Sequence, residues 1–433
     1  MNRFQWVFCQ LEVLRHCFPP SVRRILKELP DSLDETYERI LREIRKPNQG
    51  HAHQLLQCLV AAVRPLRVEE LSEVLAFDFD VEGIPKLNPS WRWEDQEEAV
   101  MSACSSLVII VNDRKSRIVQ FSHFSVKEFL TANRLAEPIR DVSRYHIRLD
   151  AAHTIIAQAC LGVLLRFDGR FNRYNIDNFP LARYAAQYWA THARFENASS
   201  RIKDGMECLF DADKPHFATW IWIYEENGGR FSMPSLHPEN PNVVPLYCAA
   251  LLGFRDLAEY LIVEHPEHVN ALGGNEWTPM HAAASAGHVD ILSLLLEHGA
   301  PVDGRGSLRS TPLFRASSNG DVEAGQLLLD HGADINARDS DGWTPLIEAA
   351  ATGQVEFARM LLERGARIDD PSGVGKTALH MAVARGNIQA ARLLLEHGAD
   401  VDARDIYGQA PVQSTQQQEI LQLLSEYGAK SVE

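Results

Sequence analysis

The feature that most constrains this chain is an interval of 33 residues that recurs through its C-terminal part. Two sets of positions keep that interval: Thr278, Thr311, Thr344 and Thr377, and the pairs Gly299-Ala300, Gly332-Ala333, Gly365-Ala366 and Gly398-Ala399. A fixed period of this kind is typical of solenoids, in which single units cannot bury their own apolar faces and therefore stack on one another. We predict a stack of equivalent units over residues 241–433.

Each part of the repeated unit has a physical role. A threonine just before a helix supplies an N-cap oxygen, and a proline fits the first helical turn, where its missing N–H costs nothing. Small residues, Ala282 to Ala284, let an inner helix lie close to its neighbours, and leucines, Leu294 to Leu296, supply the apolar surface of an outer helix. The glycine of each Gly-Ala pair ends the outer helix because glycine readily adopts the left-handed conformation.

The repeated segments, among them EWTPMHAAASAGHVDILSLLLEHGA and GKTALHMAVARGNIQAARLLLEHGA, closely resemble the ankyrin repeat and its Thr-Pro-Leu-His opening. An earlier unit, VPLYCAALLGFRDLAEYLIVEHP, is one residue out of phase, because Gly253 and Gly287 are 34 residues apart. The last unit, IYGQAPVQSTQQQEILQLLSEYGA, is short and rich in glutamine, as expected of a solvent-facing cap. The resemblance implies about six units and a protein partner bound on the concave face of the array.

Ankyrin arrays usually bind their partners with the hairpin tips and the starts of the inner helices. The resemblance therefore implies these partner-binding residues: on the tips Trp277, Arg305, Arg309, Arg338, Asp341, Trp343, Lys376 and Tyr407, and on the inner helices Arg315 and Glu348. Tryptophan and arginine are residue types that concentrate binding energy at interfaces. We expect Trp277 and Trp343 to be exposed, so that alanine at both positions weakens binding with little loss of thermal stability.

The segment DPSGVGKTALH, residues 370–380, contains a run that looks like the phosphate-binding loop of an ATPase. A true P-loop needs another glycine five places before Gly375, where this chain has Asp370, and it must follow a buried strand. Thr377 is the fourth threonine in register, and Lys376 takes the place held by Trp343 one unit earlier. We therefore predict a hairpin tip here, with neither a nucleotide nor any other cofactor.

Two groups of histidines raise the question of a metal site. His298, His331 and His397 lie at equivalent helix ends, where an imidazole suits the negative end of the helix dipole and where no cysteine or carboxylate completes a ligand set. His51 and His53, near Cys58, are two positions apart and so point to different sides of a helix. The sequence therefore predicts no metal site.

The N-terminal half is not repetitive. It reads as helices, the first opened by a capping box from Ser32 to Glu35, followed by the strands LVIIV and RIVQFSH around a tight NDRKS turn. A further helix follows, with a capping box from Ser125 to Glu128. Helices followed by a two-stranded wing predict a winged-helix-like domain over residues 31–135.

The rest of the N-terminal half is predicted to be a helical domain, residues 136–231, followed by a proline-rich linker, residues 232–245. We expect its aromatic residues to anchor the core: Tyr184, Tyr188, Trp189, Trp220 and Trp222. Trp91 and Trp93 lie in a turn-rich insertion, where they either pack it down or face a partner. The predicted fold class is mostly α, with a winged-helix-like domain and a helical domain before a repeat solenoid.

Four N-terminal segments resemble those that follow the ATPase core in NACHT-type STAND regulators, especially fungal NLR-like proteins that end in ankyrin repeats. They are FQWVFCQLEVLRHC, ELPDSLDETYERIL, RPLRVEELSEVLAF and VQFSHFSVKEFL. The resemblance implies that residues 1–30 are the end of a NACHT core and that His123 matches a histidine that reports on nucleotide phosphates. Because no Walker A loop precedes residue 31, that role requires a NACHT core in a longer form, and we expect this chain not to be an enzyme.

Charge and cysteine usage narrow the remaining alternatives. The net charge of -15 argues against broad nucleic-acid binding, and the candidate recognition helix WEDQEEAVMSAC has no Lys or Arg after Arg92. The seven scattered cysteines predict reduced thiols in the cytoplasm, with the nucleus as the alternative, and the apolar runs are too short to span a membrane. The favoured function is a non-enzymatic interaction module; the alternatives are a nucleotide-controlled switch and a winged-helix DNA-binding protein.

Overall fold

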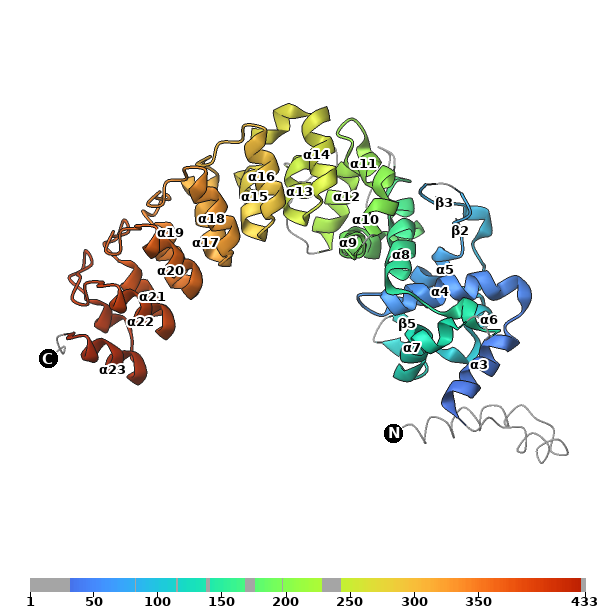
Figure 1. The fold of residues 1–433 in the computed structure, drawn as a ribbon. Coiled ribbons are helices and arrows are strands. Elements are labelled where there is room, and N and C mark those ends of the chain that lie inside the picture. The colour runs from blue at the N-terminus through green and yellow to red at the C-terminus, as the bar shows by residue number, and fades with distance from the viewer. Residues whose placement is uncertain are drawn as a thin grey trace. The chain divides into compact units, whose positions relative to one another are not determined.

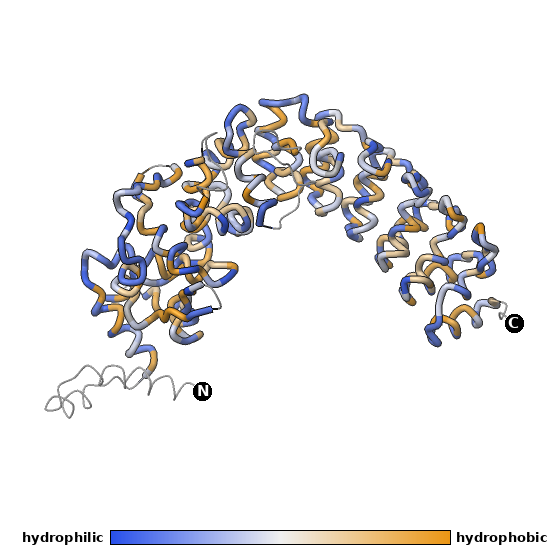
Figure 2. The backbone as a smooth tube through the Cα atoms, turned by 180° about the vertical axis from the view of Figure 1, so that it is seen from behind, coloured by the Kyte–Doolittle hydropathy of each residue, from blue (hydrophilic) through white to orange (hydrophobic). Residues whose placement is uncertain are grey.

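The structure is a computed structural model, and it describes residues 32–81, 83–113, 116–137, 141–167, 176–196, 198–227 and 243–429. The chain divides into two compact units, residues 1–229 and 230–433 (Figure 1). The predicted NACHT remnant, residues 1–30, lies outside the described residues, as do residues 232–242 of the predicted linker. Figure 2 shows that apolar and polar residues alternate along the helices of each unit, as amphipathic packing requires.

The first unit opens with the elements of the predicted winged-helix domain. Its helices are α3 (Leu33–Glu43), α4 (Gln49–Ala61), α5 (Val68–Val74), α6 (Gln96–Cys104) and α7 (Phe124–Thr131). Its strands are β1 (Leu66–Arg67), β2 (Phe77–Asp78), β3 (Lys86–Leu87), β4 (Val108–Asp113) and β5 (Ser116–Phe121). The wing is the antiparallel hairpin of β4 and β5, to which β1 adds a third strand in the order β1-β5-β4, while β2 and β3 pair separately.

The starts of two helices show where capping was predicted correctly and where it was not. Ser32 caps α3 as expected, because its hydroxyl accepts a hydrogen bond of 3.2 Å from the backbone N–H of Glu35. The predicted capping box from Ser125 to Glu128 is wrong. Helix α7 begins at Phe124, and its N-cap is His123, whose ring nitrogen Nδ1 accepts from the backbone N–H of Ser125 at 3.3 Å.

The rest of the first unit is a helical bundle. Its helices are α8 (Leu149–Leu164), α9 (Ala182–Ala193), α10 (Ala198–Arg201), α11 (Lys203–Phe210) and α12 (Pro215–Glu226). Trp189 and Trp220 meet edge to face, with ring centroids 5.4 Å apart, and the indole N–H of Trp220 donates to the backbone oxygen of Ala186 at 2.9 Å. Tyr184 and Trp222 are also buried, which confirms the predicted aromatic core, whereas Tyr188 is half-buried.

Two buried carboxylates, Glu70 and Glu73, organise the winged-helix part, and Glu73 also bonds to the segment that leads into the helical bundle. Glu70 is fully buried, and its carboxylate accepts from the guanidinium of Arg64 at 2.8 Å and from the guanidinium of Arg67 at 3.0 Å. Burial by itself raises the pKa of Glu70, but these donors outweigh burial and hold the pKa below its usual value. Glu73 bonds to Arg92 and accepts from the backbone N–H of Leu181 at 2.7 Å, just before α9.

The second unit consists of helix pairs that follow one another along the chain (Figure 1). The inner helices are α13 (Pro245–Leu252), α15 (Pro279–Ala286), α17 (Pro312–Asn319), α19 (Pro345–Thr352) and α21 (Ala378–Arg385). The outer helices are α14 (Arg255–Glu264), α16 (Val289–Glu297), α18 (Val322–Asp330), α20 (Val355–Glu363), α22 (Ile388–Glu396) and α23 (Gln418–Glu426). In the last repeat the inner helix is replaced by the short 3-10 helix η11 (Pro411–Ser414), as expected of a cap.

Further 3-10 helices occupy the connections of both units. They are η2 (Lys46–Asn48), η3 (Pro89–Trp91), η4 (Ser105–Leu107), η5 (Asn133–Ala136), η6 (Ser143–Tyr145), η7 (Ile176–Asn178), η8 (Pro266–Asn270), η9 (Gly274–Glu276) and η10 (Ser307–Arg309). In the described residues, no helix is both long enough and apolar enough to cross a membrane.

The helix ends of the repeats match the predicted chemistry. Thr311 caps α17, with its hydroxyl accepting from the backbone N–H of Phe314 at 3.2 Å. Gly299 follows α16 with φ +81°, the left-handed conformation that glycine adopts without strain. The ring Nδ1 of His298 lies 2.8 Å from the carbonyl oxygen of Leu294, and His331 and His397 repeat this bond one helical turn back. These three histidines therefore satisfy helix-end carbonyl groups, as predicted.

His281 and His380, the histidines of the Thr-Pro-Leu-His opening, link neighbouring repeats. Nδ1 of His281 accepts from the backbone N–H of Thr278 at 3.3 Å, and Nε2 lies 3.0 Å from the backbone oxygen of Ser310 in the next hairpin. His380 repeats both bonds with Thr377 and Gln409. Burial lowers the pKa of His281 to about 4, so the ring is neutral and donates from Nε2.

We expect acid to destabilise the fold through two buried neutral histidines. Burial lowers the pKa of His192 to about 3 and that of His281 to about 4, whereas unfolding returns both to about 6.5. The unfolded chain therefore takes up protons first, and each histidine should remove about 1.6 kcal/mol from the free energy of unfolding between pH 6.5 and pH 5. Urea unfolding at several pH values measures this slope, and His281→Gln should flatten it.

Candidate protein-interaction site

Successive hairpin tips are joined by backbone hydrogen bonds. The N–H of Ser340 donates to the oxygen of Leu308 at 2.7 Å, and the N–H of Gly373 donates to the oxygen of Asp341 at 2.7 Å. Ile406 extends the series by donating to Val374 at 3.2 Å. The tips that are predicted to bind a partner are therefore held in fixed register by the stacking of the units.

The Gly-Val-Gly-Lys-Thr run is one of these tips, as predicted. The N–H of Ser372 donates to the oxygen of Lys376 at 2.9 Å, and the Ser372 hydroxyl accepts from the N–H of Lys376 at 3.1 Å. Gly375 has φ +79°, and a Cβ atom there would lie 2.8 Å from the backbone nitrogen of Ile406. The element before this hairpin is the outer helix α20, whereas a P-loop requires a buried strand.

Two arginines that were predicted to contact a partner already connect neighbouring hairpins. Nη1 of Arg305 donates to the backbone oxygens of Arg309, at 2.8 Å, and Arg338, at 2.9 Å. Nη1 of Arg338 in turn donates to the backbone oxygen of Pro371 at 2.7 Å, and its Nη2 lies 3.3 Å from the carboxylate of Asp370. These contacts give Arg305 and Arg338 a structural role, and their role in binding stays a prediction.

The prediction that Trp277 and Trp343 are exposed is wrong, because both side chains are half-buried. Trp277 packs against the next hairpin, where a Cβ atom on Gly306 would lie 2.9 Å from its ring. The ring also lies under the guanidinium of Arg315, whose central carbon is 4.0 Å from the ring centroid. The Trp277 ring is thus part of the contact between two successive repeats as well as part of the surface.

Replacing Trp277 by alanine should therefore destabilise the second unit, contrary to the expectation from the sequence. Loss of a half-buried aromatic ring and of its stacked arginine should lower the free energy of unfolding by about 2 kcal/mol. Chemical unfolding followed by circular dichroism measures the change. Tyr407→Ala is the control: its side chain is 75% exposed, so its loss should change stability by less than about 0.5 kcal/mol. Equal stability of the two variants would contradict the packing described here.

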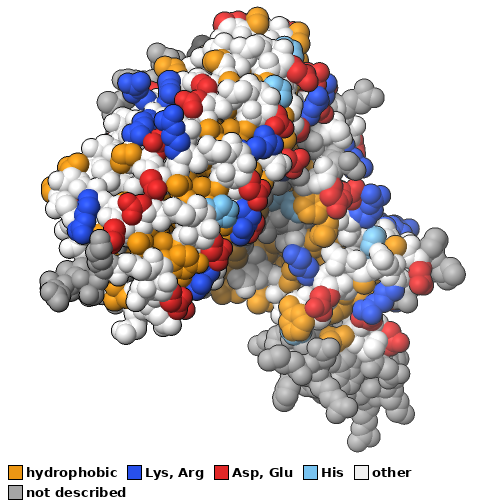
Figure 3. Space-filling model, turned by 60° about the vertical axis from the view of Figure 1, so that its left-hand side comes forward, with side chains coloured by type: hydrophobic (Ala, Val, Ile, Leu, Met, Phe, Trp, Pro, Cys, Tyr) orange, Lys and Arg blue, Asp and Glu red, His pale blue; other side chains and the backbone are white. Residues whose placement is uncertain are grey.

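The remaining predicted residues lie along the same surface. Glu348 stands on α19, one unit beyond Arg315 on α17, and its Oε1 accepts from the hydroxyl of Ser318 at 2.7 Å. Arg309, Asp341 and Tyr407 are exposed on the tips, and Lys376 is half-buried. The structure thus brings Trp277 and Arg315 into contact and distributes the others over successive tips. Figure 3 shows basic and acidic side chains mixed over much of the face in view, with several basic side chains gathered at its upper left beside acidic ones.

His123 has a structural role in the first unit. Its Nδ1 lies 2.6 Å from the hydroxyl oxygen of Ser125, which lies 2.9 Å from the hydroxyl of Tyr37 on α3. The imidazole therefore caps α7 and belongs to a side-chain network that joins α3 to α7. Whether His123 also senses a nucleotide is not decided by this geometry, so that role stays a prediction.

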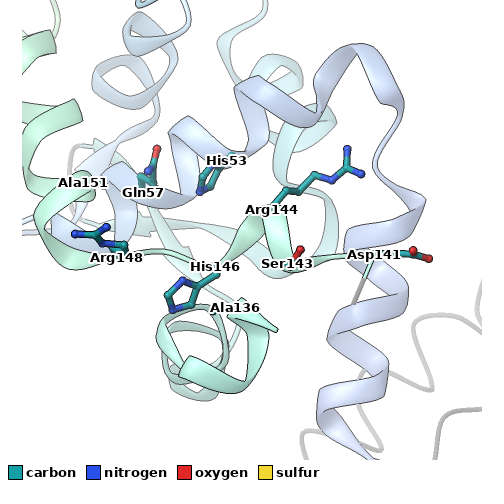
Figure 4. A pocket seen from close by; sticks show the side chains of 9 residues that line it. All are labelled: His53, Gln57, Ala136, Asp141, Ser143, Arg144, His146, Arg148 and Ala151. Atoms are coloured by element: carbon teal, nitrogen blue, oxygen red, sulfur yellow. The ribbon is translucent and has the colours of Figure 1, made fainter. Parts of the chain in front are cut away.

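An open pocket of about 660 Å³ lies beside α4, lined by His53, Gln57, Arg144, His146 and Arg148 among others (Figure 4). Its two arginines are already engaged: Arg144 donates to Gln49 at 2.7 Å and Arg148 donates to Asp150 at 2.7 Å. Figure 4 shows Arg144 directed away from His53. The cationic groups therefore do not converge on one point, as an anion site would require.

A second pocket in the first unit is lined by the two tryptophans of the turn-rich insertion. Trp91 and Trp93 are about half exposed, at 47% and 49%, and they line a cavity of about 500 Å³ with Pro47, His51 and Ala103. Of the two predicted roles, this exposure favours the one in which these rings face a partner.

In the described residues, one group of side chains has metal-ligand spacing: His265, Glu267 and His268, at η8. His265 and Glu267 form a 3.3 Å contact, and the rings of His265 and His268 stack with centroids 5.0 Å apart. These contacts account for the cluster without an ion. Of the groups considered in the sequence, His298, His331 and His397 bond to helix carbonyl oxygens, and the absence of a metal site stays a prediction.

Comparison with known proteins defines the two parts of the chain. Overlapping matches to a model of three ankyrin repeats extend over residues 246–339, 305–372, 338–405 and 367–432. Residues 37–139 match the winged helix domain of GPI inositol-deacylase. The predicted fold class, a winged-helix domain followed by ankyrin repeats, is confirmed.

Two curated proteins are similar to parts of this chain. Azaphilone pigments biosynthesis cluster protein L of Monascus ruber is 32% identical over 287 residues, which cover 62% of this chain and 60% of the relative. Alpha-latrocrustotoxin-Lt1a of Latrodectus tredecimguttatus is 39% identical over 51 residues, which cover 12% of this chain and 4% of the toxin. The chain thus spans about three fifths of the length of the Monascus relative and a small part of the toxin.

Proposed function

We propose that this chain is a non-enzymatic interaction protein whose ankyrin repeats bind a protein partner on their concave face. The observation that carries the proposal is the ladder of hairpin tips, which holds side chains from successive units in fixed register. The tips present exposed groups of different chemistry, among them Arg309, Asp341 and Tyr407. A rigid surface of this kind binds with little loss of conformational freedom, because its backbone is ordered before the partner arrives.

Site-specific photo-crosslinking tests which face binds. A photoreactive phenylalanine analogue is placed at Tyr407 on a tip, at Glu348 on an inner helix, and at Val263 on outer helix α14, where the side chain is 69% exposed. In an extract of the source organism, we expect one discrete adduct from the tip and inner-helix positions and none from Val263. Adducts that form equally from all three positions, or from Val263 alone, would overturn the proposal.

We further propose that this module belongs to a STAND or NLR-like signalling regulator that acts in the cytoplasm. The match to a winged helix domain and the similarity to a fungal protein support this context. Nucleotide control through His123 would then depend on a NACHT core in a longer form of the protein. The alternative of DNA binding is disfavoured by α6, which carries Glu97 and Glu98 in its first turn and has no basic residue.

Calorimetric titration of ADP and ATP into the full chain separates the binding module from the nucleotide-controlled switch. We expect no saturable heat from either nucleotide, since the lysine and glycine cradle needed for phosphate are replaced here by a hairpin tip. Saturable binding that disappears in His123→Ala, with Lys376→Ala unaffected as the control, would instead support the switch.

A further inference from the structure

The guanidinium of Arg315 makes no hydrogen bond or ion pair with any residue that the structure describes. Its Nε atom is shielded from solvent, and so is the indole N–H of Trp277 beneath it; neither has an acceptor among the described residues. Three other arginines of this surface differ. Arg305 and Arg338 donate to hairpin carbonyls, and Arg404 donates to the backbone oxygen of Gly408 at 2.8 Å.

Leaving these donors without an acceptor is costly. A buried donor without a partner has lost its hydrogen bonds to water and gained none from the protein, and this loss is larger when the donor is charged. The face of Trp277 offsets part of that cost by a cation–π contact. The nearby carboxylate of Glu348 attracts the guanidinium but remains hydrogen-bonded to Ser318 and forms no ion pair with it. Arg315 is therefore held in position by stacking while its hydrogen-bonding capacity is unused.

The position of Arg315 in the repeat makes this arrangement specific to one unit. It stands four residues after Thr311, where the equivalent positions carry Ala282 one unit earlier and Met381 two units later. It lies at the start of inner helix α17, among the positions from which the proposed function requires partner contacts. The terminal nitrogens of the guanidinium are not enclosed by the protein, so an acceptor on a partner reaches them from solvent.

We propose that Arg315, stacked on Trp277, forms a subsite that binds the carboxylate of an acidic side chain on the protein partner. The inference rests on the proposed function, since it assigns a chemistry to one position of the same concave surface. A guanidinium presents its N–H donors in a planar fork that matches a carboxylate. A carboxylate fits this subsite better than a phosphate. One guanidinium balances a single negative charge, whereas the second charge of a phosphate would be repelled by Glu348 and by the net charge of -15 on the whole chain.

Selection of a random peptide library on the immobilised full chain tests the subsite. We expect peptides selected on the wild-type protein to be enriched in Asp or Glu at one position. Arg315→Gln should weaken the binding of the best peptide by about 10- to 100-fold, the loss that corresponds to a charged hydrogen bond of about 1.5–3 kcal/mol. Arg315→Lys should restore part of the affinity, because it keeps the charge without the fork. The control Arg359→Gln removes an arginine of outer helix α20 whose side chain is 41% exposed, and it should change affinity little. Arg309→Gln tests the hairpin tip instead.

The outcomes separate the subsite from the function on which it rests. Peptides that bind the wild-type protein without acidic enrichment, or with equal affinity for Arg315→Gln, overturn the subsite and leave the interaction module standing. Acidic peptides that bind Arg315→Gln as tightly as the wild-type protein but do not bind Arg309→Gln would place the acid-binding site on the hairpin tip. That result also overturns the Arg315 subsite. Circular dichroism of each variant shows whether the fold is retained. If Arg315→Gln fails to fold, the comparison of Arg315→Lys with wild type decides, and equal affinity of the two refutes the forked contact.

Discussion

Glu70→Gln should lower the free energy of unfolding of the first unit by about 3–5 kcal/mol, the effect expected for breaking a buried ion pair. The carboxylate of Glu70 is completely buried and accepts four hydrogen bonds from Arg64 and from the backbone N–H and guanidinium of Arg67. A neutral amide of the same shape removes the negative charge while both arginines stay in place. Its N–H₂ group then also faces donors rather than acceptors.

Chemical unfolding followed by the fluorescence of the buried tryptophans measures the loss. Glu69→Gln is the matched control: this neighbouring carboxylate is half-buried, and its nearest arginine, Arg117, lies 3.8 Å away at the surface. Exposed ion pairs contribute about 0–1 kcal/mol, so the control should change stability little. Similar stability losses for the two variants would show that the network around Glu70 does not hold the unit together.

Gly342→Ala should destabilise the second unit by about 2–4 kcal/mol, while Gly365→Ala should cost only about 1 kcal/mol. Both glycines have positive φ, +75° and +88°, so alanine is strained at each position because its Cβ atom disfavours the left-handed conformation. They differ in the space around them. A Cβ atom at Gly342 would lie 2.5 Å from the backbone nitrogen of Gly373, whereas no atom of the described residues would lie within 4 Å of one at Gly365.

The difference between these two variants isolates the contact between hairpins. The N–H of Gly373 donates to the oxygen of Asp341 at 2.7 Å, so the backbone that would meet the new methyl group is itself held in the ladder. Urea unfolding of both variants, followed by circular dichroism, gives the comparison. Equal losses would mean that only backbone conformation matters and that the tips do not lie in contact.

Much of the second unit was predictable because the chemistry of a repeat is local. Threonine caps, left-handed glycines and helix-end histidines act within a few residues of their own position, and the 33-residue interval repeats them. The contacts between successive repeats were not predictable in the same way. Arg305 bonds to Arg338, and Trp277 packs beside Gly306, because stacking brings together residues about one repeat apart. Nothing in the sequence of a single repeat shows how closely the next repeat approaches it.

The first unit shows a second limit of sequence reasoning. The strands and helices of the wing follow from hydrophobic periodicity, but the cap of α7 does not. Ser125 has the residue type of a cap, yet His123 performs that role while Ser125 bonds to Tyr37, 88 positions earlier in the chain. The candidate binding residues were predicted by position in the repeat alone. Their burial and their use in structural contacts depend on neighbours that the spacing does not specify.

Hydrogen–deuterium exchange of the full chain, with and without the tightest peptide from the selection, tests the central claim most directly. The account predicts slower exchange on binding in residues 277–281 and 311–319, which include a hairpin tip and inner helix α17. Outer helices α16 and α18 should exchange at unchanged rates. Protection confined to those outer helices, or to the first unit around His123, would contradict binding on the concave face of the repeats.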